Sequence, residues 1–568
     1  MFMAPLRSSI SRTARLRDAV PTTCLVLLVM ALAGYRLTLI DRGHFFWGDE
    51  HRYRDAEALV DDIEAGEYRA AVGHLDGYAC RPAFTLISAI PAFAQRYLNP
   101  MLGINPGTLR YYNIASAFNV LLTLGITVCV WGIARAWMRC PWYALLVAAV
   151  FSLLCHANVW IRHLMPYSAS LLLFLAALWL LSSELRTGRQ ASVRIAAAGV
   201  LSACGYACYT GYYAFVLLNL AVLLATQPRR LRALLLFCGS AIAAVAVFEL
   251  LAQLTGGSYL LAMLTFSGDH TRIIQGWPAE GYVFVWRYLR EVEGLIGVVL
   301  FVLFVGCGVF VLWRRKVGIS PLARAGIIAA IACYLLHASL SVFTLQTRFY
   351  GRILGMYLPF LVCGAVLTLR HIPARNVRRV AACGVVATSC WSFATFAIPY
   401  ARMVYPADFL ATTMAQRGRP VTYPPMALWA PAGQIPNRTV EGIDPDLVTV
   451  VDTAPEGSRA VVHWASHEEA HTSGARFIGV NLKWMFNVWE KDHRFSAPAG
   501  YRLIAEAPHP NGLRAIGFEV HKPWERKRLR RRHYTVRLYE RLDDPQPMAL
   551  RPQQQETGPN REHDSHGI

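Results

Sequence analysis

Two adjacent carboxylates, Asp49 and Glu50, follow the aromatic run Phe45–Trp47 shortly after the first long apolar segment of the chain. Aromatic rings of this kind are typical of a membrane–water interface, and Gly48 allows a turn that would aim the carboxylates. A carboxylate held there could accept a proton from a sugar hydroxyl that attacks an activated donor. A solvated acidic loop beside an aromatic belt explains the same composition, so both interpretations stay open.

Three arginines could bind an anion at the same side of a membrane. Arg81 precedes Pro82 at the start of an expected helix, and Arg348 and Arg352 lie between two late apolar segments. The planar guanidinium group suits phosphate, and arginine near a bilayer is usually retained for a partner or a function. The alternative is snorkelling of these side chains to the lipid headgroups.

Other polar residues give weaker signals. Glu249 lies inside an apolar segment, which makes it a candidate for substrate contact or for a structural hydrogen bond. The histidines expected on the outer side lack the spacing of metal ligands, so a divalent metal stays open without support from ligand spacing, and no definite cofactor is assigned. These histidines are His44, His51, His74 and His163.

The composition predicts a membrane protein. Of 568 residues, 55% are hydrophobic and 16% are charged, and the mean hydropathy is +0.33. Soluble domains carry roughly 25% charged residues, so an ordinary cytosolic enzyme and a disordered scaffold are both excluded. Lys+Arg number 56 against 36 Asp+Glu. In a membrane protein that excess marks the cytoplasmic loops and does not indicate a nucleic-acid partner.

We expect about eleven transmembrane helices, since each span needs roughly 20 mostly apolar residues. The shorter run 84–98, interrupted by Pro91 and Arg96, is expected to lie at the interface. The expected spans are 21–40, 110–133, 141–159, 165–183, 195–210, 212–228, 232–253, 294–313, 325–345, 353–370 and 380–400.

Arginine and lysine gather at the N-terminus and in alternate connections between these spans. By the positive-inside rule we expect a cytoplasmic N-terminus in the cell (inner) membrane and an extracytoplasmic C-terminal region. The first apolar segment lacks a small-residue cleavage site and is expected to remain as an anchor.

The predicted fold class is an all-α polytopic membrane protein with a small α+β extracytoplasmic domain. A cytoplasmic segment 1–20 precedes a transmembrane domain 21–400, whose first outer loop is 41–109. Short strand-like stretches predict the α+β domain over 401–525. The remaining 526–568 is expected to be a basic and then disordered tail, which could also contact anionic lipid.

The early acidic pair, the basic-Pro step and the late arginine segment together resemble the GT-C membrane glycosyltransferases. The chain is most similar to the protein O-mannosyltransferase, aminoarabinose transferase and Rgt-like (lipid-A-core) bacterial branch, over roughly 20–400. The resemblance implies a GT-C-like fold and transfer of one sugar from a polyprenyl-phosphate donor to a glycolipid, polysaccharide or protein acceptor. It also implies that transfer occurs at the outer membrane face, with inversion at the anomeric carbon.

The resemblance assigns residue roles. Asp49 matches the catalytic acid and Glu50 its companion, while Arg81 matches the basic residue of a Lys/Arg-Pro-Pro step. Arg348 and Arg352 occupy the segment whose basic residues meet the carrier phosphate. With Asp49 as base, the three arginines would stabilise the leaving phosphate.

A second outer connection also matches the family. Arg162 and His163 occupy its Arg-rich segment and are candidates for substrate contact. Where the family often has a second acid, this chain has Tyr167, so a metal that bridges two acids is not predicted.

Other functions remain open. A transporter or flippase of a lipid-linked saccharide would use the same arginines to hold phosphate. An O-antigen ligase or polymerase is a third possibility, against which the early acidic pair speaks, and a non-catalytic GT-C-like protein is a fourth. Replacement of Asp49 by Asn separates the first two, because it should abolish transfer and spare carrier binding.

Overall fold

The protein is described from a computed structural model. It covers residues 5–40, 52–75, 81–104, 109–183, 189–274, 280–313, 319–344 and 350–402, the single positions 413 and 416, and 421–422, 448–451, 460–465, 477–481, 499–509 and 534–542. Asp49, Glu50 and Arg348 lie outside these residues.

Helices occupy every segment that was expected to span a membrane. Six are long and apolar enough by length and composition, and five of the expected spans are shorter apolar helices. The six long ones are Ala19–Leu37, Arg110–Met138, Arg189–Cys208, Arg230–Leu254, Pro321–Thr344 and Arg375–Ala397. The five shorter ones are Pro141–Leu153, Pro166–Ser182, Thr210–Thr226, Leu295–Gly308 and Leu358–Arg370. The expected class, a polytopic helical membrane protein, is therefore confirmed.

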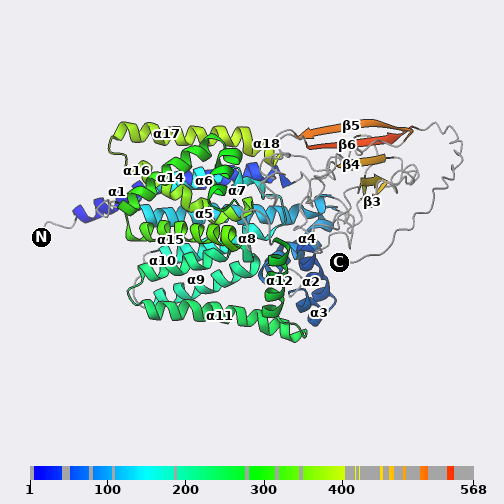
Figure 1. The fold of residues 1–568 in the computed structure, drawn as a ribbon, viewed down its shortest axis with the longest axis horizontal. Helices are drawn as coiled ribbons and strands as arrows, with labels where there is room; N and C mark the ends of the chain where they lie inside the picture. The colour runs from blue at the N-terminus through cyan, green and yellow to red at the C-terminus, as the bar shows by residue number, and fades with distance from the viewer. Residues whose placement is uncertain are drawn as a thin grey trace, which may run out of the picture.

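The long helices run side by side along the molecule, and the strands lie at the end opposite the N-terminus (Figure 1). The helices are α1 (Pro5–Leu37), α5 (Asn113–Met138), α6 (Pro141–Leu153), α8 (Pro166–Ser182), α9 (Arg189–Cys208), α10 (Tyr213–Thr226), α11 (Arg230–Leu254), α14 (Leu295–Trp313), α15 (Pro321–Ser339), α16 (Leu358–Arg370) and α17 (Arg375–Ser392). Short helices between and after them are α7 (His156–Val159), α13 (Phe284–Tyr288) and α18 (Ile398–Ala401).

Proline sets the start of several helices. Pro141, Pro166 and Pro321 each occupy the first turn, where the missing N–H leaves no hydrogen bond unmade. Ser320 caps α15 by accepting a hydrogen bond from the Ala323 N–H at 3.1 Å. These local signals fix the starts of helices at both ends of the bundle, since Pro166 lies at the end opposite to Pro141 and Pro321.

The largest core lies where α5, α6, α8, α10, α14, α15 and α16 meet. Phe174 of α8 stacks on Phe215 of α10 with ring centroids 5.1 Å apart. At the edge of the bundle, α9 and α11 approach closely at Gly199, where an added Cβ would lie 2.3 Å from the Phe237 carbonyl oxygen. Only glycine allows that approach of the two backbones.

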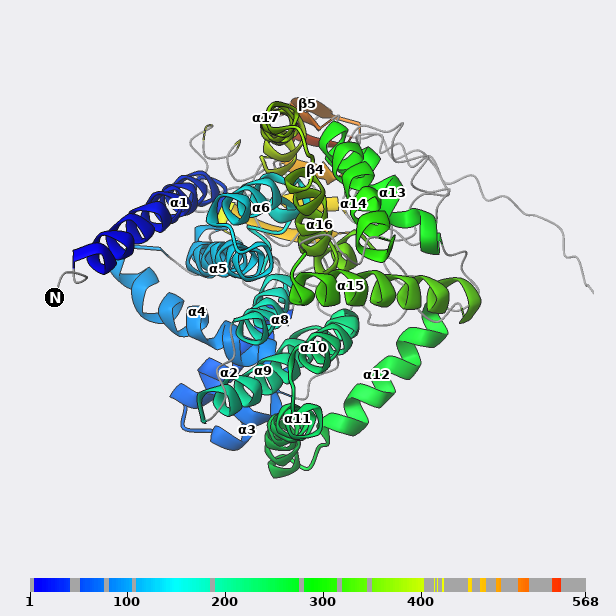
Figure 2. The ribbon, with the colours of Figure 1, turned by 90° about the vertical axis from the view of Figure 1, so that its left-hand side faces the viewer.

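Two helices lie outside the main bundle. The segment expected at the interface forms α4 (Pro82–Met101), and its exposed apolar residues include Ile90 (59%) and Met101 (81%). Helix α12 (Tyr259–Ile274), which was not among the expected elements, crosses between α11 and α15 and runs transverse to the bundle helices (Figure 2). Asp269 and His270 lie in this helix.

The outer loop contains α2 (Tyr53–Glu64) and α3 (Tyr68–Gly73). Tyr53 anchors α2 to α4, because its hydroxyl donates to Gln95 Oε1 at 2.6 Å and its ring meets Tyr112 edge-on at 6.1 Å.

A sheet of six strands follows the helices, in the order β1-β3-β2-β4-β6-β5. Only β1 and β3 pair in parallel, and the other pairs are antiparallel. The strands are β1 (Val421–Thr422), β2 (Val448–Val451), β3 (Ala460–Ala465), β4 (Phe477–Asn481), β5 (Tyr501–His509) and β6 (Tyr534–Arg541).

The last strand corrects the expected boundary at 525. Tyr534–Arg541 lies in the segment expected to be a basic and then disordered tail, yet it pairs with both β4 and β5. Its residues alternate in the manner of a strand, and Leu538 is fully buried. The preceding basic run therefore connects two strands of one sheet.

Candidate functional site

Two nearly buried arginines meet at one end of the bundle through a pair of tyrosines. The Arg81 guanidinium lies 4.9 Å from the ring centroid of Tyr209, and that of Arg352 lies 5.2 Å from Tyr167. The two tyrosine rings contact each other edge-on at 4.8 Å. Arg81 and Arg352 are each 8% exposed. Two residues assigned to the carrier phosphate are thus brought together by aromatic neighbours.

Four separate elements supply these side chains. Arg81 stands immediately before α4, Tyr209 follows the end of α9, Tyr167 is in the first turn of α8, and Arg352 lies in a 3-10 turn, Gly351–Met356, before α16. Because each residue is at a helix terminus, the site sits at the level where the helices begin and end.

Hydrogen bonds fix Arg352 in this position. Its Nη1 donates to the Tyr167 hydroxyl, and its backbone carbonyl accepts from the Tyr212 hydroxyl at 2.8 Å. A second ring, Tyr350, lies 4.8 Å from the same guanidinium. Aromatic faces stabilise a cation without neutralising its charge, so these two ring contacts leave Arg352 positively charged.

The Arg162–His163 connection meets the arginine–tyrosine group through Trp160, whose ring centroid lies 6.0 Å from that of His163 and 5.5 Å from that of Tyr167. Asn119 of α5 places its Nδ2 2.7 Å from the Ile161 carbonyl oxygen and 3.1 Å from that of His163. The Ser116 hydroxyl donates to the Arg162 carbonyl at 3.2 Å. Arg162 and His163 are 2% and 1% exposed, so any contact with a substrate would have to come from within the bundle.

The candidate acids Asp49 and Glu50 cannot be placed, and neither can Arg348, because they lie outside the described residues. Their flanking residues are described. Leu39 shares a hydrophobic cluster with Ile161, and Tyr53 shares another with Leu164. The described residues on the two sides of the segment 41–51 therefore both lie beside the Arg162–His163 connection.

Glu57 of α2 is an acidic residue that the sequence analysis did not identify as a candidate. Burial, and then the charge of Asp61, raise the pKa of Glu57 to about 8, against a hydrogen bond from Tyr112 that lowers it. Burial also raises the pKa of Asp55, against the opposing charge of Arg52. Glu57 is thus protonated near neutral pH and could donate a proton or a hydrogen bond.

Glu249 makes structural contacts. It accepts hydrogen bonds from the Leu260 N–H at 3.0 Å and from Gln253 Nε2 at 3.2 Å. The first contact ties α11 to the first turn of α12. Its proposed role in substrate contact stays a prediction.

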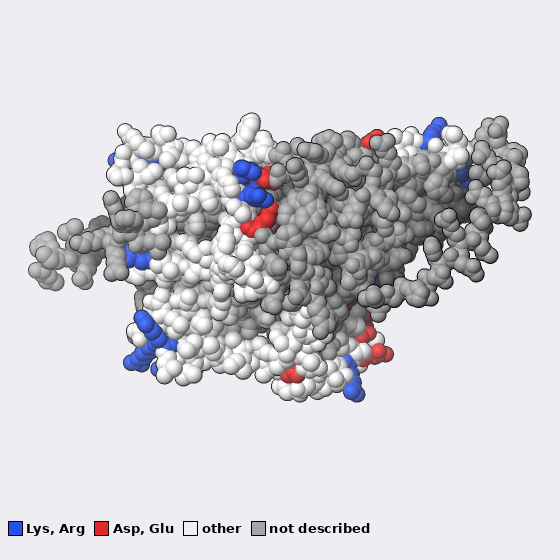
Figure 3. All heavy atoms as spheres, in the orientation of Figure 1, with Lys and Arg blue, Asp and Glu red and all other residues white. Residues whose placement is uncertain are grey.

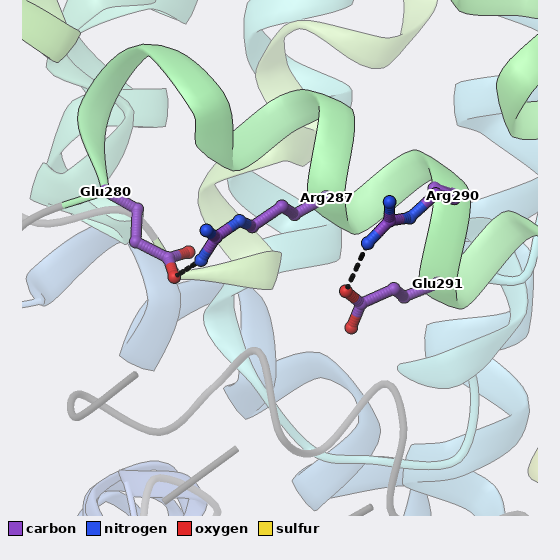
Figure 4. Close-up of polar contacts among 4 residues, drawn as sticks. All are labelled: Glu280, Arg287, Arg290 and Glu291. Carbon is purple, nitrogen blue, oxygen red and sulfur yellow. Dashed lines mark hydrogen bonds and ion pairs between the residues drawn. The ribbon is translucent and has the colours of Figure 1, made fainter. Parts of the chain in front are cut away.

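The acidic residues shortly before α14 are of two kinds, ion-paired and buried. Glu280 pairs with Arg287, and Glu291 pairs with Arg290 at 3.4 Å (Figure 4). Glu293 is instead fully buried and accepts from the N–H groups of Cys155 and His156 at 2.7 and 2.9 Å. Glu293 therefore joins the start of α7 to the start of α14.

A buried cation extends the polar region into the bundle. Arg36 of α1 is 1% exposed, and its guanidinium donates to Thr123 Oγ1 at 3.1 Å, Asn158 Oδ1 at 3.3 Å and the Ser152 carbonyl at 3.5 Å. It lines a cavity of about 30 Å³, enough for a water molecule, whose wall also includes Tyr167. An arginine within an apolar run was the signal that could have revealed it.

No group of three or more His, Cys, Asp or Glu that could hold a metal ion occurs among the residues that the structure describes. The chemistry that these residues support is binding of an anion by guanidinium groups and proton transfer by carboxyl groups.

By its fold this chain is a polytopic helical membrane protein that carries a β-sheet at one end. No model of a known protein family matches it, and no curated protein matches its sequence. Among solved structures it is similar to the crystal structure of ArnT from Cupriavidus metallidurans bound to undecaprenyl phosphate. The identity is 14%, the TM-score is 0.42, and the alignment covers 70% of this chain and 73% of that chain.

Proposed function

We propose that the protein is a GT-C-like glycosyltransferase that moves one sugar from a polyprenyl-phosphate donor to an acceptor at the outer face of the cell membrane. The single observation that carries the proposal is the contact of Arg81 and Arg352 with the Tyr167–Tyr209 pair. Two cations held at the ends of membrane helices suit a lipid-linked phosphate, which presents its charge at that level. The resemblance in the order of the sequence motifs supports the same class.

In the proposed reaction Asp49 removes the proton of the acceptor hydroxyl, whose oxygen attacks the anomeric carbon of the donor. The bond between that carbon and the phosphate oxygen breaks as the new bond forms on the opposite face, which inverts the configuration. The polyprenyl phosphate leaves with both electrons of the broken bond. Arg81 and Arg352 stabilise the charge that develops on it, and Arg348 is proposed to assist.

Chain connectivity is compatible with this arrangement. Asp49 is three residues before Arg52, so their Cα atoms are separated by at most about 11 Å. Arg52 begins the segment that Tyr53 anchors to Gln95 of α4, about 21 Å along that helix from Arg81, so the carboxylate of Asp49 and the guanidinium of Arg81 would approach the donor from different sides. In this proposal the N-terminus is cytoplasmic and the sheet domain extracytoplasmic, on the side of the acceptor.

The test uses full-length protein in proteoliposomes with radiolabelled polyprenyl-phosphate sugars and a membrane extract as acceptor. Asp49→Asn should lower transfer by about 10²–10⁴-fold, the usual contribution of a general base, and should leave polyprenyl-phosphate binding intact. Asp61→Asn is the matched control, because Asp61 is an exposed acid of α2 whose partner Arg96 is also exposed.

Three results would contradict the proposal. Transfer by Asp49→Asn at the wild-type rate would show that Asp49 is not the general base. Movement of the labelled donor across the bilayer without transfer, sensitive to loss of Arg81 or Arg352, would identify a flippase. Failure of the wild-type protein to transfer any of the sugars would favour a non-catalytic protein of the same fold.

A further inference from the structure

One acidic side chain close to the arginine–tyrosine site is buried inside the bundle. On the face shown in Figure 3, charged side chains of the described residues gather toward the two ends of the bundle, and the surface between them is largely uncharged. Glu280 and Glu291 pair with arginines, whereas Glu293 is fully buried and forms no ion pair with the residues that the structure describes. Burial of a carboxylate is costly unless hydrogen bonds satisfy its oxygens. The hydrogen bonds of Glu293 therefore show what this side chain holds in place.

Both carboxylate oxygens of Glu293 accept hydrogen bonds from the start of α7. Its Oε2 accepts from the Cys155 N–H at 2.7 Å, and its Oε1 accepts from the His156 N–H at 2.9 Å. A glutamine side chain has a single accepting oxygen, and its NH₂ group would face one of these N–H groups donor to donor. The arrangement therefore requires a carboxylate and not merely a polar side chain of the same size.

Helix α7 depends on side chains for its position. It has four residues (His156–Val159), too few for a helix that is stable by its own hydrogen bonds. Asn158 Nδ2 donates to the Leu154 carbonyl at 2.7 Å, and Glu293 accepts from the first N–H groups. Glu293 is itself fixed by α17, because the Ser392 hydroxyl donates to its backbone carbonyl. The position of α7 is thus set by the start of α14 and by α17.

The His156 ring carries this position to the turn that contains Arg352. Its Nδ1 lies 3.0 Å from the Tyr288 hydroxyl, which orients the ring. Its other edge faces Gly355, where an added Cβ would lie 2.8 Å from His156 Nε2. Only glycine allows this approach, so the 3-10 turn Gly351–Met356 rests directly on the imidazole.

The same contact includes an anchor of Arg352. The Cβ added at Gly355 would also lie 2.8 Å from the Tyr212 hydroxyl, which donates to the Arg352 carbonyl at 2.8 Å. His156, Tyr212 and Tyr167 line one cavity of about 30 Å³. Space for about one water molecule leaves these side chains little freedom to move independently. A displacement of His156 would therefore disturb the side chains that anchor Arg352.

We propose that Glu293 and His156 are positioning residues that set the direction of the Arg352 guanidinium. Glu293 fixes α7, α7 presents the imidazole, and the imidazole supports the turn whose guanidinium meets the phosphate of the polyprenyl carrier. Neither residue contacts the substrate or transfers a proton. The proposal rests on the proposed function in assigning that phosphate to Arg352.

Binding of radiolabelled polyprenyl phosphate to the full-length protein in phosphatidylcholine nanodiscs tests the proposal without turnover. Glu293→Gln should raise the Kd for polyprenyl phosphate about tenfold, because an N–H of α7 loses its acceptor and Arg352 is no longer held toward the phosphate. In the Arg352→Lys background the same substitution should raise the Kd less than about threefold, since residues that act through one another are not additive. In the transfer assay, kcat should fall with little change in the KM for the donor, because the phosphate gains its charge only as the bond breaks.

Three further variants complete the design, each with thermal unfolding measured in parallel. Glu291→Gln is the matched control and should bind as the wild type does, because Glu291 lies on the same turn and pairs with Arg290, whose side chain is 53% exposed. Gly355→Ala tests the next contact without a change at Glu293, and its methyl group should raise the Kd about tenfold by displacing the turn. Addition of His156→Ala gives that methyl group space and should recover at least about threefold of the loss.

The proposal is overturned if folded Glu293→Gln binds polyprenyl phosphate as the wild type does, or if its Kd rises by the same factor in both backgrounds. If Glu293→Gln does not fold, an unchanged Kd for Gly355→Ala, or no recovery with His156→Ala, overturns it. An equal effect of Glu291→Gln would overturn it as well, because loss of any nearby charge would then suffice. A wild-type protein that binds polyprenyl phosphate but transfers no sugar contradicts the proposed function alone, whereas absence of binding overturns both.

Discussion

The contact between Tyr167 and Arg352 gives the sharpest test of the candidate site. Tyr167→Phe removes only the hydroxyl that accepts a hydrogen bond from Arg352 Nη1. The ring remains, and with it the contact to the guanidinium at 5.2 Å and to Tyr209 at 4.8 Å. The substitution thus frees Arg352 from its anchor without removing a charge.

The size of the expected loss in kcat follows from the burial of the hydrogen bond between Tyr167 and Arg352. A hydrogen bond to a charged group contributes about 1.5–3 kcal/mol. If Arg352 must be oriented toward the leaving phosphate, that loss falls on the transition state and lowers kcat by about 10- to 100-fold. The KM for the donor should change much less, since the charge develops only as the bond breaks.

The assay is initial-rate transfer from a labelled polyprenyl-phosphate sugar in proteoliposomes, with thermal unfolding measured in parallel to separate activity from stability. Tyr97→Phe is the matched control, because Tyr97 is 61% exposed on α4. Tyr167→Phe is then repeated in the Arg352→Lys background, where it should cost less than about threefold, because residues in contact are not additive.

Either of two results would refute this reasoning. Tyr167→Phe could turn over at the wild-type rate, which would mean that the anchor does not matter to the reaction. Tyr167→Phe could also lower kcat by the same factor in the wild-type and the Arg352→Lys backgrounds, which would show that Tyr167 acts independently of Arg352.

Two further predictions concern stability. Because Glu57 has a pKa of about 8 in the fold and near 4.5 when unfolded, the folded state binds the extra proton and loses stability as pH rises from about 4.5 to 8. Glu57→Gln should therefore raise Tm relative to wild type by an amount that grows over that pH range. The control Glu67→Gln, at an exposed position, should not. A difference in Tm that stays constant with pH would contradict this prediction. Gly199→Ala should destabilise by about 1–3 kcal/mol in denaturant unfolding, because its Cβ would meet α11, whereas Gly239→Ala, with open space around it, should not. Equal effects of the two glycine variants would refute the close-packing argument.

The helical part of the fold was predictable because apolar length is a local property. Each expected span became a helix, and prolines such as Pro166 marked starts that the sequence displays directly. The helix α12 was missed because its apolar portion, Tyr259–Gly268, is shorter than a bilayer span. The strand β6 was missed because it follows a basic run, although Tyr534–Arg541 itself alternates as strands do.

The candidate site was predictable only in part. Residue type pointed to Arg81 and Arg352 as anion ligands, but of the tyrosines that join them one lies on α8 and the other directly after α9, 42 positions apart. A pairing of that kind depends on how helices pack, which no local pattern encodes. The roles of Asp49, Glu50 and Arg348 stay predictions, since these residues are outside the described part of the chain.

The burial of Arg36 has a consequence for how the chain is assembled during synthesis. The nearest of its three hydrogen-bond partners along the chain is 87 residues later and the farthest 122. At about 5–20 residues per second, the ribosome reaches them roughly 5–25 s after Arg36 itself. The first helix is therefore made before the partners of Arg36 exist, and Arg36 can form all three buried hydrogen bonds only after the third apolar helix has been synthesised.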